Sequence, residues 1–171
     1  MADINFTPQS EAPSDTAFPS EAELRRGMEL LFFAYRDFTG RPDEILAEFG
    51  LGRAHHRVLY FVGRNPKISV NALLDILLIT KQSLSRVLGR LIRQGYIAQH
   101  SGEKDRRLRL LELTKKGADL EHRLFSNQQT RLARAYRLAG PAAVEGFWQV
   151  LADIPDHPPL MKKTSRKREE S

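Results

Sequence analysis

The sequence has no cysteine and no long apolar run. Without cysteine, disulfides, thiolate metal sites and thiol-based redox sensing are excluded. No stretch reaches the roughly 18 uninterrupted apolar residues that a membrane span needs. Residues 1–23 are acidic and proline-rich, whereas a secretory leader begins with a basic segment. We therefore expect a cytoplasmic protein with no membrane partner.

Motifs that carry catalysis or bind metals are also missing. The five histidines form no His-x-x-x-His pair, and there is neither a phosphate loop nor a nucleophile elbow. On a helix the adjacent His55 and His56 point about 100° apart, so they cannot bind one ion together. The sequence predicts no catalytic residue, no metal ligands, no cofactor and no enzymatic activity. It leaves open a metal site assembled between helices.

What the chain does have is positive charge in one region. The net charge is +6 and the sequence pI is about 9.8. Between Thr80 and Lys116 there are ten cations against three acids, a surplus of seven that exceeds the charge of the whole chain. This distribution favours a polyanionic partner.

Apolar periodicity predicts mostly helices. The pattern indicates helices after Ser20, near Arg53, after Ser69, after Thr80 and after Thr114, and a last one after Gly140-Pro141. Gly40 and Pro42 are expected to end the first helix. Residues 96–100 and 106–114 are typical of two strands joined by the short tip 101–105. We expect a mainly α (α+β) fold with a flexible arm at 1–20 and a basic flexible tail at 157–171.

The helix predicted after Thr80 has two distinct faces. At 100° per residue its leucines and other apolar side chains fall on one arc, and the opposite arc carries arginine, serine and glutamine but no acid. Arginine and glutamine match the edges of guanine and adenine in the major groove. The residues that we expect to contact DNA are Lys81, Gln82, Ser83, Ser85, Arg86 and Arg90. An ordinary solvated arginine face is the alternative, and Gly89 on this arc either lets DNA approach closely or is a tolerated surface glycine.

The hairpin that follows is basic at its tip and arm. A helix-turn-helix followed directly by a basic hairpin is a winged helix, in which the hairpin is the wing. We expect Arg106 and Arg107 to reach the minor groove or phosphates and Lys104 to add positive charge. Asp105 is expected to hold the wing arginines in position rather than to touch DNA. The alternatives are a solvated loop for the hairpin, and for Lys115 and Lys116 either a nearby phosphate or a solvated helix start.

The segments ISVNALLDILLITKQSLSRVLGRLIRQGYI and DRRLRLLELTKKG carry a family resemblance. From about residue 24 to 154 the chain resembles the MarR family of bacterial winged helix-turn-helix transcription regulators. Its wing signature matches at Asp105, Arg106, Arg107, Leu113, Thr114 and Gly117. The turn at residues 77–80 is more apolar than in the family, and the two termini lie outside the resemblance.

The resemblance implies a homodimer that binds a pseudo-palindromic operator in double-stranded DNA. On this view 51–113 is the DNA-binding head, while 21–50 and 114–156 supply dimerisation helices. The interface would contain Leu31, Phe32, Tyr35, Leu132, Tyr136, Phe147, Trp148 and Leu151, although these residues alone would equally suit an intramolecular core. Many family members respond to a small aromatic acid, so such an effector is a possible partner. The alternative function is a winged-helix interaction or RNA-binding module without operator specificity.

Overall fold

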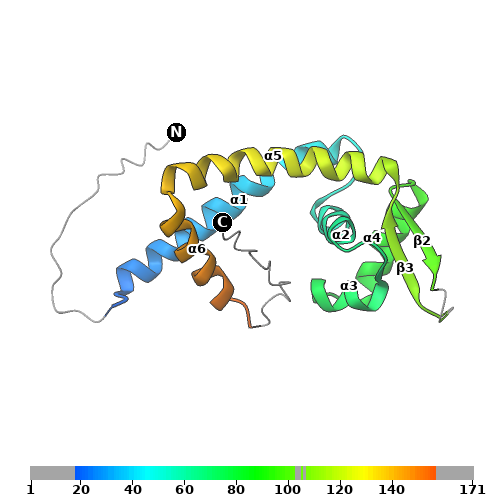
Figure 1. The fold of residues 1–171 in the computed structure, drawn as a ribbon, viewed down its shortest axis with the longest axis horizontal. Helices are drawn as coiled ribbons and strands as arrows, with labels where there is room; N and C mark the ends of the chain where they lie inside the picture. The colour runs from blue at the N-terminus through cyan, green and yellow to red at the C-terminus, as the bar shows by residue number, and fades with distance from the viewer. Residues whose placement is uncertain (1–17, 103–104, 106, 157–171) are drawn as a thin grey trace, which may run out of the picture. The chain divides into compact units, whose positions relative to one another are not determined.

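The computed structural model describes residues 18–102, 105 and 107–156, and Figure 1 shows its ribbon. The chain divides into two compact units, and the boundary between them falls within the first helix, between Asp37 and Phe38. The predicted arm up to residue 17 and the tail 157–171 lie outside the described residues, as do Lys104 and Arg106. In chain order the elements are α1 (Glu21–Ala47), α2 (Arg53–Arg64), β1 (Ile68–Ser69), α3 (Val70–Leu77), α4 (Lys81–Arg93), β2 (Ile97–Ser101), β3 (Arg109–Leu113), α5 (Lys115–Ala139) and α6 (Pro141–Asp153).

The predicted capping residues start their helices as expected. Ser69 accepts a hydrogen bond from the Ala72 amide at 3.1 Å, and Thr80 accepts one from the Ser83 amide at 3.2 Å. At the start of α1, the Ser20 amide donates to the Glu23 carboxylate at 2.8 Å, which lowers the pKa of that carboxyl. Local side-chain chemistry therefore sets where these helices begin.

The expected end of the first helix is wrong, because α1 continues through Gly40 and Pro42 to Ala47. Proline has no amide hydrogen, so the Phe38 carbonyl loses its usual helical donor. The side-chain amide of Gln128 on α5 donates to that carbonyl at 3.4 Å, and Pro42 itself is buried. A residue from a distant helix thus supplies the donor that proline lacks.

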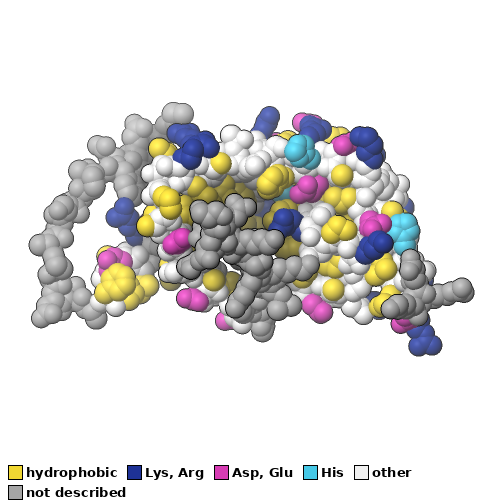
Figure 2. Space-filling view, viewed as in Figure 1, with side chains coloured by type: hydrophobic (Ala, Val, Ile, Leu, Met, Phe, Trp, Pro, Cys, Tyr) yellow, Lys and Arg dark blue, Asp and Glu magenta, His cyan; other side chains and the backbone are white. Residues whose placement is uncertain are grey.

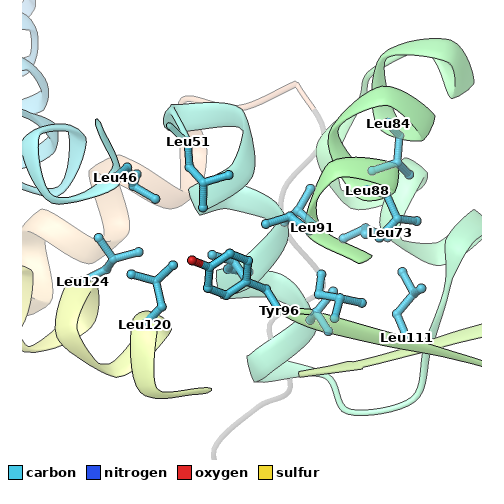
Figure 3. Packing of buried hydrophobic residues seen from close by; sticks show 14 of the residues in the cluster. Leu46, Leu51, Leu73, Leu84, Leu88, Leu91, Tyr96, Leu111, Leu120 and Leu124 are labelled. Carbon is cyan, nitrogen blue, oxygen red and sulfur yellow. The ribbon is translucent and has the colours of Figure 1, made fainter. Parts of the chain in front are cut away.

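One hydrophobic core lies within residues 38–156 and joins α2, α3 and α4 to the small sheet and to α5. Figure 3 shows Tyr96 between Leu91 of α4 and the α5 residues Leu120 and Leu124. The leucines predicted on the apolar arc of α4 are buried here. Burying a leucine side chain contributes roughly 1.5–3 kcal/mol, so this arc anchors α4 and leaves its other arc at the surface.

The sheet has three antiparallel strands in the order β1-β3-β2. The β2–β3 hairpin is the predicted wing, with Ile97 opposite Leu113 and Ser101 opposite Arg109. The two-residue strand β1 was not predicted; it pairs Ile68 with Leu111. Because β1 runs directly into α3, this pairing attaches the start of the helix-turn-helix to the wing.

The end of α4 meets the start of α5 at very short range. Thr114 caps α5 by accepting a hydrogen bond from the Gly117 amide at 3.1 Å, and its hydroxyl donates to the Gly95 carbonyl at 2.7 Å. A Cβ on Gly117 would lie 2.0 Å from the Tyr96 carbonyl oxygen. The Thr-x-x-Gly part of the signature therefore has a steric cause, since only glycine lets these two backbones pack together.

Replacing Gly117 with alanine should destabilise the protein by about 1–3 kcal/mol, the usual cost of overpacking a tight contact. Urea unfolding measures the change. Gly40→Ala is the control, because nothing lies within 4 Å of a Cβ there; alanine in that helix should be neutral or stabilising. Equal stability of Gly117→Ala and the parent protein would contradict this contact.

Candidate nucleic-acid interface

The exposed face of α4 presents most of the predicted contact residues together. Lys81, Gln82, Ser83, Ser85 and Arg86 are all exposed. The buried leucines on the opposite side fix the helix, so these side chains project outward from a rigid element. This face contains two cations and several neutral hydrogen-bonding groups.

Arg90 is separated from that group. It is half-buried, and its Nη2 lies so close to Gly50 that a Cβ there would be 2.8 Å away. Burial, and then the positive charge of Arg90, lower the pKa of His55 on α2. The structure therefore places Arg90 against the loop between α1 and α2, away from the exposed end of the helix.

The wing backbone is shaped by Asp105. Its carboxylate accepts a hydrogen bond from the Arg107 amide at 2.8 Å, and its carbonyl accepts one from the Leu108 amide at 3.0 Å. A Cβ on Gly102 would lie 2.8 Å from the same carbonyl, so glycine permits this tight turn. These contacts are the local kind by which aspartate stabilises turns. They agree with the expectation that Asp105 positions the wing.

A groove of about 450 Å³ lies between α4 and the wing. Lys81 and Ser85 line it from α4, and Arg107 and Arg109 line it from the wing. Among the residues that the structure describes, every polar or charged side chain on its wall is neutral or cationic. Figure 2 shows basic side chains on the surface near the end of the β2–β3 hairpin. The arrangement suits an extended anion that contacts helix and wing at once.

Asn71 at the start of α3 and Gln99 on β2 also line this groove, and the sequence reasoning missed them. Asn71 follows the correctly predicted cap Ser69, so its place at a helix start was a usable signal. Gln99 lies two residues before the end of β2. The Gln99 side chain lines the groove because of the way β2 pairs in the sheet, and the sequence does not show that pairing.

The apolar turn between α3 and α4 has an unusual backbone. Leu78 ends α3 in the left-handed region, with φ 50°, and its side chain is 67% exposed. A left-handed leucine costs roughly 1–2 kcal/mol. The helix-turn-helix geometry is nevertheless formed, because the Leu78 amide bonds to Leu74 and Thr80 starts α4.

The adjacent histidines of α2 are held by local contacts and packing. His55 Nδ1 accepts a hydrogen bond from the Gly52 amide at 3.1 Å. His56 is buried, which lowers its pKa. In the part of the chain that the structure describes, no group of three histidine or carboxylate side chains is arranged to hold a metal ion. No helix among the described residues is long and apolar enough to cross a membrane.

A helix-turn-helix followed by a β-hairpin, with a cationic groove between them, defines a winged helix-turn-helix protein. Residues 49–108 match the model of the MarR family. The chain is 48% identical over 146 residues to the HTH-type transcriptional regulator PetP of Rhodobacter capsulatus, covering 85% of this chain and 87% of PetP. The chain therefore belongs to the MarR family of transcriptional regulators, and the expectation of a non-enzymatic protein is confirmed.

Solved structures agree on the fold. The MarR family transcription regulator SP03579 has a TM-score of 0.65 at 17% identity, covering 76% of this chain and 86% of that one. The transcription regulator MarR from Oenococcus oeni PSU-1 has a TM-score of 0.59 at 20% identity, covering 72% and 94%. The predicted mainly α winged-helix fold is confirmed.

Gly89→Ala should make the protein more stable and bind duplex DNA less tightly. Only the flexible Arg93 guanidinium comes near the added Cβ, at 3.3 Å, so α4 should gain about 0.5–1 kcal/mol. If α4 enters the DNA major groove as the sequence predicts, the methyl would hold the helix away from the bases. Thermal unfolding and DNA titration measure the two effects. Unchanged DNA affinity would instead make Gly89 a tolerated surface glycine.

Proposed function

We propose that the protein is a homodimeric, sequence-specific transcriptional regulator that binds a pseudo-palindromic operator in double-stranded DNA. The groove between α4 and the wing carries this proposal. Lys81 and Arg107 reach it from segments far apart in the sequence, and none of the described residues that line it is acidic. Phosphates would supply most of the affinity and base edges the specificity.

In this arrangement α4 enters the major groove and Arg86 reads a base edge. Arg86 is exposed near the middle of the polar arc, next to Gln82 and Ser85. Arginine can form two hydrogen bonds with guanine. Arg107, and with it Arg106 and Lys104 outside the described residues, would contact the phosphates or the minor groove beside it.

The homodimer is supported by apolar surface that the described part of one chain leaves uncovered. On α1, Phe32 is 63% exposed, and Leu31 and Tyr35 are also exposed. On α5 and α6, Leu132, Phe147, Trp148 and Leu151 are exposed. Trp148 Nε1 donates to the Tyr136 hydroxyl at 2.9 Å, so the aromatic rings form an ordered cluster. Exposed apolar patches of this kind mark interfaces.

On this proposal residues 21–50 and 114–156 supply the dimerisation helices and 51–113 the head. A small aromatic effector remains a prediction from the family resemblance.

Arg86→Ala should weaken binding to the selected operator by about 1–3 kcal/mol and binding to random duplexes much less. The operator is first selected from random DNA with the parent protein, and both affinities are measured at one salt concentration. Arg64→Ala removes the same charge from the end of α2 and serves as control. An equal loss on both duplexes would make Arg86 a phosphate contact, and equal binding of duplex RNA would favour an RNA-binding module.

Phe32→Glu should convert the dimer to a monomer, because it places a charge in an apolar interface. Sedimentation at micromolar concentration measures the mass. Operator affinity should fall about a hundredfold or more, since the second head no longer binds in the same complex. Leu78→Glu alters a similarly exposed leucine outside the proposed interface and should remain dimeric. A parent protein that sediments as a monomer would refute the dimer.

A further inference from the structure

Three consecutive carbonyl groups at the end of α4 are all bound by the start of α5. The Gln94 carbonyl accepts from the Lys116 ammonium at 2.9 Å and the Gly95 carbonyl from the Thr114 hydroxyl at 2.7 Å. The Tyr96 carbonyl accepts from the Thr114 amide at 3.0 Å. We call these contacts the α4–α5 junction. The junction supplies hydrogen-bond donors to carbonyl groups at the negative, C-terminal end of the α4 dipole.

Lys116 takes part in this junction although its position in α5 is electrostatically unfavourable. A cation in the first turn of a helix is opposed by the helix dipole. Here its ammonium lies 4.4 Å from the centre of the Tyr96 ring as well as on the Gln94 carbonyl. The C-terminal end of α4 and the aromatic face offset the cost. The Lys116 side chain therefore acts across two helices.

The neighbouring Lys115 provides a natural contrast. Its ammonium pairs with Asp119 on the same helix at 2.9 Å, and its side chain is 89% exposed. Such an exposed pair contributes little. Lys115 and Lys116 thus carry the same charge, lie in the same helix turn and are both exposed, but of the two only Lys116 bonds to the end of α4.

The junction ties the end of α4 directly to the start of α5. After α4 the chain forms the β2–β3 hairpin and returns to Thr114 beside Tyr96. The end of α4 and the start of α5 are therefore in direct contact. Thr114 and Gly117 set the distance of closest approach. In the same first turn of α5, Lys116 adds a side-chain bond to the Gln94 carbonyl.

We propose that Lys116 is a positioning residue that fixes the angle between α4 and α5 and thereby the spacing of half-sites that the dimer accepts. The proposal rests on the proposed function, in which α5 belongs to the dimerisation region and α4 reads DNA. Two heads held at a fixed angle fit one separation of half-sites. Heads that can rotate fit several.

The test compares Lys116→Met with Lys115→Met. Methionine keeps an apolar stem on the Tyr96 ring and removes the donor, and both variants lose the same charge. Lys116→Arg should restore the parent behaviour, because a guanidinium can still donate to the Gln94 carbonyl. The DNA set contains the selected operator, versions with the half-sites moved by one or two base pairs, and a duplex with a single half-site.

The readout is the ratio of affinities for the best spacing and for the altered spacings. For Lys116→Met we expect this ratio to fall about tenfold, as for the loss of a hydrogen bond to a charged group. Affinity for the single half-site should match that of Lys115→Met, because both lose one charge. Lys116 is exposed, so both variants should fold, and thermal unfolding confirms it.

The outcomes separate the two proposals. A parent protein that prefers no sequence and no spacing overturns the proposed function itself. A parent protein with a clear spacing preference that Lys116→Met retains overturns only the role of Lys116. A uniform loss on all duplexes, including the half-site, would likewise overturn it, because Lys116 would then act as a phosphate contact.

Discussion

The close approach of Gly117 to the Tyr96 carbonyl is the constraint on which the rest of the head depends. A side chain at residue 117 would separate the first turn of α5 from the backbone that ends α4. The Tyr96 ring would then leave the core between Leu91 and Leu120 (Figure 3). Because β2 begins at the next residue, the wing would move as well. Core, reading helix and wing are therefore built around a contact that needs the smallest residue.

The predicted DNA contacts illustrate how rigid packing places flexible side chains. Periodicity alone separates the buried leucines of α4 from its polar arc, and that separation is found in the structure. Periodicity cannot distinguish Arg86 from Arg90, since both lie on the same arc. The difference comes from the loop at Gly50, which covers one end of the arc and leaves the other exposed. Tertiary packing therefore determines which arginines are exposed for binding.

Much of the fold could be predicted because its signals are local. Ser69, Thr80 and Thr114 cap helices through bonds to residues three positions away, and the hairpin follows from alternating residues. The continuation of α1 through Pro42 and the presence of strand β1 could not be predicted. Strand β1 has only two residues, too few for a periodic signal, and exists through its pairing with β3. The candidate site also has a predictable and an unpredictable part. The polar face of α4 could be predicted from the sequence, whereas Asn71 and Gln99 line the groove because of packing and strand register.

The bond from Gln128 to the Phe38 carbonyl has a consequence for the order of folding during synthesis. Residues around Pro42 leave the ribosome long before Gln128 does. Until α5 arrives, this carbonyl of α1 has only water as a donor at the point where proline interrupts the helical hydrogen bonds. In a nascent chain, the first helix is therefore expected to be interrupted at this point. The uninterrupted helix becomes favourable only when the second half of the protein has been made.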